Sequence, residues 1–103
     1  MLKEYIAVLD TVPDFMVPTL VAHAVLGAHF VFKDNIEYDL WVNFSFRKVV
    51  IKVTQKEFNR ILELPLVHIA HESTLDGDKS CLVVCPREEY PNVIKFARMW
   101  KPQ

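Results

Sequence analysis

The sequence predicts an α/β domain in which helices cover both faces of a sheet. Strand-like and helix-like segments follow one another in the order β-α-β-α-β-β-α, which is typical of strands joined by helical crossovers, with one hairpin. Right-handed crossovers that run in opposite directions across the sheet place the first two helices on opposite faces. A length of 103 residues suits one core. We therefore predict a three-layer α/β/α sandwich, formed as a single domain by residues 1–103.

Composition and charge narrow the classes of function. Hydrophobic residues make up 51% and charged residues 24% of the chain, as in a globular protein. The formal net charge of −1 does not indicate a nucleic-acid or anionic-membrane surface. A nucleic-acid-binding role would need a local basic patch. We expect a cytoplasmic protein without a membrane partner, because residues 1–5 contain Glu4 and do not resemble a signal peptide. The densest basic group consists of Arg47, Lys48, Lys52 and Lys56. It is a candidate patch for phosphate contacts, but a solvated sheet edge and helix start explain it equally well.

The apolar run 4–9 predicts a first strand that is buried on both faces. A loop with one proline and two aspartates, residues 10–17, then leads into a helix expected over residues 17–32. Pro18 suits the first turn of this helix, where no backbone N–H is needed.

The helix expected over residues 17–32 is almost wholly apolar and carries His23 at its middle. It is shorter than the roughly 18 to 20 residues of a membrane span and contains two histidines, so we interpret it as a buried helix. Gly27, one turn after His23, costs about 1 kcal/mol relative to alanine. This predicts that another element approaches closely there. A single histidine on such a helix is more often a packing residue than a catalyst, and both roles stay open.

The middle of the chain predicts a packed loop, a strand and a helix. Residues 40–46 hold three aromatic side chains and are interpreted as the loop, whereas residues 48–53 are rich in β-branched side chains and predict a second strand, suited to a sheet edge. Thr54 and Glu57 form a capping box, so a second helix is expected to begin there and to end near Pro65.

The last third predicts two further strands and a closing helix. Residues 66–71 and 80–85 form the strands, and Asp76-Gly77 between them is a tight-turn signal. The closing helix is expected to run from about Pro91 to residue 100. Its buried face would consist of Val93, Phe96, Ala97 and Trp100.

The two cysteines, Cys81 and Cys85, lie four residues apart in a strand, which separates them by about 13 Å. A disulfide needs Cα atoms within about 7 Å, so we interpret both as buried thiols. His68 and His71 are three residues apart on a strand, so they point to opposite faces and make a poor metal pair. We expect neither a metal ion nor another cofactor.

Several of these segments together resemble the type-2 peptidyl-tRNA hydrolases. That family has a helix carrying His-Ala, a tryptophan about seven residues before a Lys-Val-Val-Leu-Lys-Val strand, and a late apolar strand ending in proline. The resemblance extends over nearly the whole chain and implies a four-stranded mixed sheet. We therefore predict the strand order 2-1-4-3 with strand 3 antiparallel. The matching residues here are His23-Ala24, Trp41, 48–53 and 82–86.

Other positions depart from the family. Its Lys-x-Lys element before the first helix corresponds here to Asp14 and Met16, its glutamine before the histidine to Leu20, and its arginine after the first strand to Asp10. Binding of tRNA needs cations at the phosphates, and ester hydrolysis needs donors for the developing oxyanion. Negative charge stands here where the family has positive charge.

The resemblance implies a divergent peptidyl-tRNA hydrolase-like enzyme that cleaves the ester of peptidyl-tRNA or a related acyl ester. In that function His23 would be the acid, base or orienting group, Glu72 its carboxylate partner, and Ser80 or Thr11 would place the water or the ester. The alternative is a non-catalytic module on the same scaffold that binds a protein or a tRNA. The missing cations favour this alternative.

The sequence also predicts a homodimer. The helix over residues 17–32 has apolar or small residues on more of its circumference than one core contact uses, and twofold dimers are the commonest closed assembly. The competing interpretation is that the 40–46 loop and the closing helix cover the apolar residues within one subunit. The aromatic residues concerned are Phe44, Phe46, Phe96 and Trp100.

Overall fold

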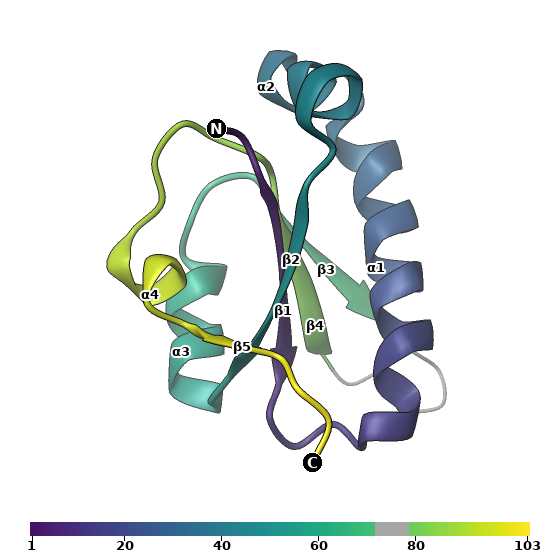
Figure 1. The fold of residues 1–103 in the computed structure, drawn as a ribbon, viewed down its shortest axis with the longest axis vertical. Coiled ribbons are helices and arrows are strands. Elements are labelled where there is room, and N and C mark those ends of the chain that lie inside the picture. Colours follow the sequence, from purple (N-terminus) through teal and green to yellow (C-terminus); the bar gives the residue numbers. More distant parts are fainter. Residues whose placement is uncertain (72–78) are drawn as a thin grey trace.

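The computed structural model contains one mixed sheet with the strand order β3-β4-β1-β2-β5 (Figure 1). It describes residues 1–71 and 79–103. At the centre, β1 (Glu4–Leu9) is parallel to β2 (Lys48–Val53) and antiparallel to β4 (Lys79–Val84). The edges are formed by β3 (Val67–His71), beside β4, and β5 (Arg98–Met99), beside β2.

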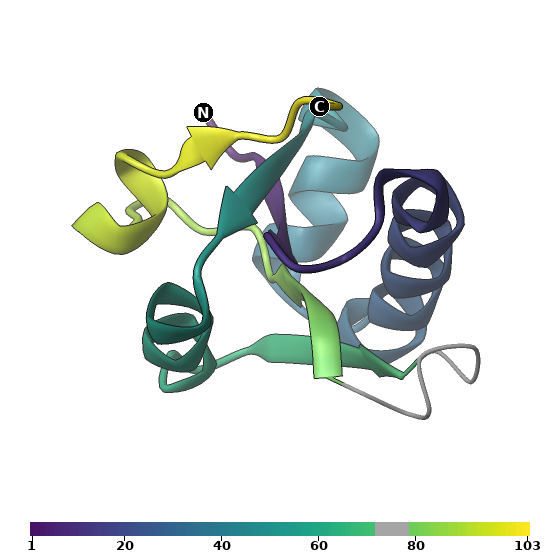
Figure 2. The same ribbon diagram turned by 90° about the horizontal axis from the view of Figure 1, so that it is seen from below.

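Helices lie on both faces of this sheet. The long helix α1 (Val17–Phe32) packs on β3, β4 and β1, whereas α3 (Gln55–Leu62) and α4 (Asn92–Lys95) lie on the opposite side (Figures 1 and 2). The expected placement of the first two long helices on opposite faces is therefore seen. The side chains of β1 alternate between these layers, and most are buried on both sides.

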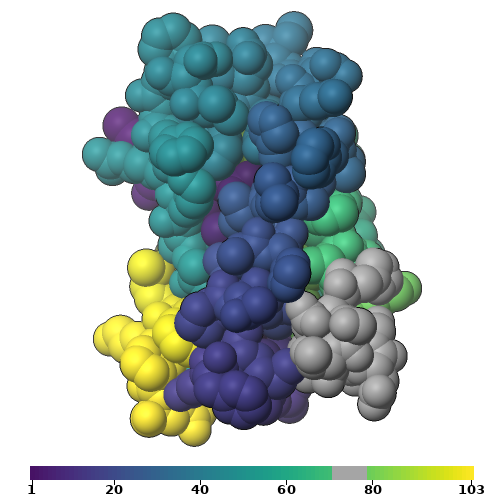
Figure 3. Space-filling model, turned by 90° about the vertical axis from the view of Figure 1, so that its right-hand side faces the viewer, coloured from purple at the N-terminus to yellow at the C-terminus, as the bar shows by residue number. Residues whose placement is uncertain are grey.

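The prediction of a four-stranded sheet with a closing helix up to residue 100 was wrong. The helix α4 ends at Lys95, and the chain then pairs with β2 through β5 and through the N–H of Trp100, which donates to Val50 O at 2.9 Å. Phe96, expected in the core, is 80% exposed. An edge at β2 would leave backbone groups unpaired, and the C-terminal segment pairs with them instead. This segment continues to the start of α1 (Figure 3), where Gln103 N–H donates to Asp14 Oδ2 at 2.6 Å.

The predicted order 2-1-4-3 matches the first four strands, but the direction of one strand differs from the prediction. β3 is antiparallel to its neighbour β4, yet it runs in the same direction as β1 and β2, and β4 is the strand among these four that runs the other way. The cause is the connection. A helical crossover through α3 makes β3 parallel to β2, and the chain then returns antiparallel as β4 between β3 and β1. The expected Asp76-Gly77 turn lies outside the described residues.

Residues 40–46, expected as a loop, are mostly helical. A short helix α2 (Ile36–Leu40) is capped by Asn35, whose side chain accepts from Tyr38 N–H at 3.0 Å, and it continues into the wide π-type turn η2 (Trp41–Ser45). Trp41 is buried, and its indole N–H donates to Arg47 O at 2.7 Å. This hydrogen bond fixes η2 against the start of β2.

Two local predictions about helices are confirmed. Thr54 Oγ1 accepts from Glu57 N–H at 3.2 Å and Glu57 Oε1 accepts from Thr54 N–H at 2.8 Å, which is the capping box expected at the start of α3. A Cβ placed on Gly27 would lie 2.6 Å from His68 Nε2. The element that approaches α1 at Gly27 is therefore β3.

The turn η1 (Asp14–Met16) continues directly into α1, so the helical segment Asp14–Phe32 has 19 residues, and an 18-residue window within it has a mean hydropathy of 1.7. Among the described residues, this helix is long and apolar enough to cross a membrane by length and composition alone. The argument that residues 17–32 are too short for a membrane span therefore does not hold for the longer segment. Core helices of globular domains pass the same test, and α1 packs along three strands.

Candidate functional site

A small polar cavity lies where β1 ends and β4 and α3 begin. Its volume is about 360 Å³. We call it the polar cavity. Two of the candidate site residues from the sequence, Thr11 and Ser80, both line it, although they are far apart in the chain. The lining residues are Leu9, Thr11, Val12, Pro13, Gln55, Lys79 and Ser80.

Ser80 gives this cavity its most unusual chemical feature. Its side chain is 4% exposed, and its Oγ has no hydrogen-bond partner. A buried hydroxyl without a partner costs roughly 1 to 3 kcal/mol, so such groups are rare unless a ligand or water pairs with them. The exposed Lys79, its neighbour in β4, supplies a positive charge to the same cavity.

The amino end of α3 also faces the polar cavity, because Gln55 is the first residue of that helix. The amino end of a helix carries partial positive charge. The carboxylate of Glu57, held in the capping box, offsets part of it. Lys79 is therefore the main source of positive charge at the cavity.

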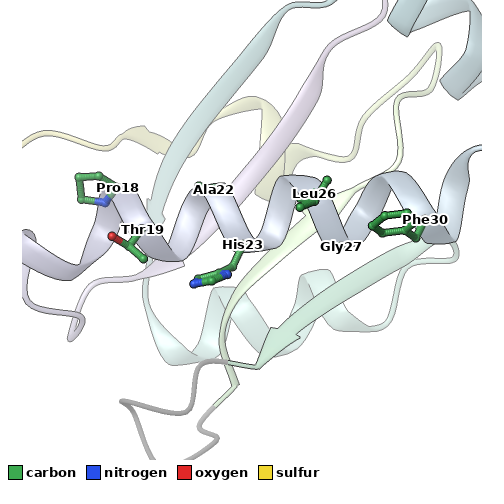
Figure 4. A pocket seen from close by; sticks show the side chains of 7 residues that line it. All are labelled: Pro18, Thr19, Ala22, His23, Leu26, Gly27 and Phe30. Atoms are coloured by element: carbon green, nitrogen blue, oxygen red, sulfur yellow. The ribbon is translucent and has the colours of Figure 1, made fainter.

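His23 lies on a different part of the surface. It is exposed on α1 and lines an open groove (Figure 4), where its side chain projects away from that of Leu26. It does not line the polar cavity, and Glu72 lies outside the described residues. The structure thus brings Thr11 and Ser80 together without His23. The groove is lined by Pro18, Thr19, Ala22, His23, Leu26, Gly27 and Phe30.

The described lining of the polar cavity contains hydroxyl, amide and ammonium groups, but no imidazole, carboxylate or thiol. A serine or threonine hydroxyl is a weak nucleophile without an adjacent base. The hydroxyl, amide and ammonium groups that are described there can hydrogen-bond to an anionic group.

A second, apolar cavity of about 450 Å³ was missed by the sequence analysis. We call it the aromatic cavity. It lies between α1, the α2–η2 segment and the start of β2. The tryptophan and the aromatic cluster were visible in the sequence, but nothing there showed that α1 would face them. It is lined by Ala22, Val25, Leu26, His29, Tyr38, Trp41, Val42, Phe46 and Lys48.

Glu4 was also missed, because it begins a run that otherwise predicts a buried strand. Its side chain is fully buried, and neither carboxylate oxygen has a hydrogen-bond partner. Burial raises the pKa of Glu4 to about 7, although the positive charge of Lys48, its partner in the β1–β2 register, acts in the opposite direction. The nearby Glu4 carboxylate contributes, after burial, to a Tyr38 pKa of about 12.

The expected buried thiols are confirmed. Cys81 and Cys85 are free and fully buried, and burial raises their pKa values to about 12 and about 11. Thiols of this kind stay protonated and are poor nucleophiles. Within residues 1–71 and 79–103 no three potential metal ligands of the His, Cys, Asp and Glu types come together.

In comparisons with known proteins, no protein-family model and no curated protein matches this chain.

Proposed function

We propose that this chain is a non-catalytic binding module on a type-2 peptidyl-tRNA hydrolase-like scaffold, and that its polar cavity holds an anionic group of the ligand. The observation that carries the proposal is the buried, unpartnered hydroxyl of Ser80 in a cavity that also holds Lys79 and Thr11. A phosphate or carboxylate oxygen would accept from both hydroxyls and pair with the ammonium group.

The charges around the cavity favour a small ligand over a long polyanion. Asp10 and Thr11 are adjacent in the loop after β1, and Asp14 follows in η1, so two carboxylates belong to the loop that leads from the cavity into α1. A tRNA backbone needs several cations along its path. One cation and two hydroxyls suit a single anionic group.

The strand order β3-β4-β1-β2 supports the scaffold part of the proposal, because it is the order that the resemblance implies. Function does not follow from a scaffold alone. The absence of an imidazole or carboxylate from the described cavity lining favours binding over ester hydrolysis.

The test is a titration of the ¹⁵N-labelled protein with inorganic phosphate, followed by NMR. We expect the amide signals of Thr11, Gln55 and Ser80 to shift together, and Lys79→Met to weaken binding about fivefold, since one exposed charge pair contributes about 1 kcal/mol. Lys95→Met, which removes an exposed lysine on α4, is the matched control and should leave binding unchanged. Equal effects of the two variants, or shifts elsewhere, would contradict the proposal.

Hydrolysis is tested separately with purified peptidyl-tRNA. We expect no turnover above the rate without protein. Turnover that His23→Ala abolishes, while the fold is retained, would restore the hydrolase interpretation in place of the binding module.

The homodimer also remains a proposal. It is supported by the solvent-exposed aromatic residues Phe30, Phe44 and Phe46, which are 66%, 84% and 58% exposed in the single chain. Sedimentation over a micromolar concentration series tests it. A mass that stays at 12.0 kDa would contradict it.

A further inference from the structure

The aromatic cavity lies between α1 and the segment formed by residues 38–48. The helix α1 packs mainly on β3, β4 and β1, whereas the start of β2 lies beside η2, where the Trp41 indole N–H donates to Arg47 O. Figure 3 shows the hollow between the blue surface of α1 and the teal surface of the segment that follows it, with purple atoms of the N-terminal segment between them. A cavity of about 450 Å³ lies within the size range of small-molecule sites.

The aromatic wall is held in place before any ligand arrives. Phe46 has a φ of 60°, a left-handed conformation that costs a bulky residue roughly 1 to 3 kcal/mol. It is held by its N–H, which donates to Trp41 O at 2.6 Å, and by stacking on the Trp41 ring with centroids 5.3 Å apart. Backbone strain of this size persists where surrounding contacts fix it, and here it presents an exposed ring at the cavity wall.

Lys48 is the only permanently charged residue in the described lining of this cavity. Its ammonium nitrogen lies 3.1 Å from the centroid of the Phe46 ring and 5.1 Å from that of Trp41, and it donates to Phe46 O at 3.1 Å. An ammonium group has three N–H donors, and this carbonyl takes one of them. The charge is therefore fixed beside the aromatic wall while donors remain for an incoming acceptor.

The other polar side-chain groups of the described lining already have partners within the chain: the Trp41 indole N–H donates to Arg47 O, and His29 pairs with Tyr38. His29 Nδ1 and Tyr38 Oη are 3.1 Å apart. A ligand therefore meets an apolar surface with one positive charge at its edge. A cationic ligand would be repelled by Lys48, and a polyphosphate would lack further cations.

We propose that the aromatic cavity binds a small amphipathic monocarboxylate, whose apolar body packs on Val25, Trp41 and Phe46 and whose carboxylate pairs with Lys48. This site is separate from the polar cavity, since the two share no lining residue. Below pH 7 the neighbouring Glu4 carboxyl group is mostly protonated, since its pKa is about 7, and leaves the charge of Lys48 uncompensated.

The test compares 2-naphthoate with 2-naphthylmethanol, a neutral molecule of the same shape, at pH 6. Binding is followed by the NMR signals of the ¹⁵N-labelled full chain. We expect both probes to shift the Trp41 indole signal, with the acid bound five- to tenfold more tightly. Lys48→Met should remove this preference, because an ion pair beside an apolar wall contributes roughly one power of ten in affinity.

Two further variants make the result decisive. Lys52→Met removes the next lysine on the same face of β2 and should leave the preference for the acid intact. Val25→Trp fills the cavity and should weaken both probes. The surface variant Lys48→Met keeps the test valid if Val25→Trp does not fold. An alcohol bound as tightly as the acid, or an equal loss in Lys48→Met and Lys52→Met, would overturn the proposal.

Discussion

The two cavities differ in how their polar groups are paired. In the polar cavity the Ser80 hydroxyl is buried without a partner, whereas around the aromatic cavity the His29–Tyr38 pair and the Trp41 indole N–H have partners within the chain. The polar cavity therefore has a group that a ligand or water would satisfy. In the described lining of the aromatic cavity only the Lys48 ammonium keeps donors for a ligand, so a ligand there would gain mainly apolar contact and one charged interaction.

This difference separates two sources of binding energy. A ligand of the polar cavity would replace a missing hydrogen bond, so its affinity depends on the hydroxyl and on charge. A ligand of the aromatic cavity would remove apolar surface from water, at about 25 cal/mol per Å². The effect of a substitution on the free energy of unfolding therefore shows whether a side chain at either cavity stabilises the fold without a ligand.

The largest effect is expected at the aromatic cavity. Trp41→Ala should lower the free energy of unfolding by about 3 to 5 kcal/mol, because it removes a buried indole and its hydrogen bond to Arg47. Chemical denaturation measures this. Phe44→Ala, in the same turn η2 but 84% exposed, is the control and should change stability by less than about 0.5 kcal/mol. Similar losses in both variants would mean that Trp41 does not organise this region.

Near the aromatic cavity, Glu4 differs from the paired polar groups, because its buried carboxyl group has no hydrogen-bond partner. Its pKa is about 7 in the folded chain and 4.5 ordinarily, so the folded state binds the proton more tightly. Stability should therefore fall as pH rises from about 4.5 to 7, by roughly 3 kcal/mol in all.

Glu4→Gln should remove this loss, so that its stability relative to the parent chain rises between pH 5 and pH 8. Urea denaturation at the two pH values measures the difference. Glu88→Gln, an exposed glutamate, is the control, and a parallel pH dependence of Glu4→Gln and the parent would refute the assignment.

A smaller effect, opposite in sign to that of Trp41→Ala, is expected at the polar cavity. Ser80→Ala removes a buried hydroxyl that has no partner, so stability should stay the same or rise by about 1 kcal/mol. Thermal denaturation without phosphate checks this. A loss above about 1 kcal/mol would show that Ser80 is paired in solution, and the contrast between the cavities would disappear.

The smallest effect concerns the packing of α1, which forms one wall of the aromatic cavity. Gly27→Ala should gain up to about 1 kcal/mol of helix propensity, but it displaces the His68 side chain, whose Nε2 lies where the new methyl group would lie. We therefore expect Gly27→Ala to stabilise the His68→Ala background more than the parent chain. A double-mutant cycle measures the coupling, and additivity within experimental error would contradict the close approach.

Local sequence signals were sufficient for the elements that carry their own pattern. The strands at residues 4–9 and 48–53, the helix at residues 17–32 and the Thr54 cap all agree with the structure. Each depends on the spacing of apolar side chains or on a hydrogen bond between residues three apart. Such information lies within one short segment.

The candidate site could be predicted only in part. The resemblance pointed to Thr11 and Ser80, and the structure places both in the polar cavity, but it places His23 in another groove. No local rule connects a loop after the first strand with a residue 69 positions later. The register of β1 with β4 makes that connection.

The sequence by itself determined where most strands and helices lie, because backbone propensity and apolar periodicity act over a few residues. Tertiary structure decided the rest. The pairing of β5 depends on an open edge at β2, and the burial of Glu4 and the closure of the aromatic cavity depend on packing between segments distant in the chain. An apolar pattern shows that a side chain will be buried, but the side chains it will meet depend on which segments the fold brings together.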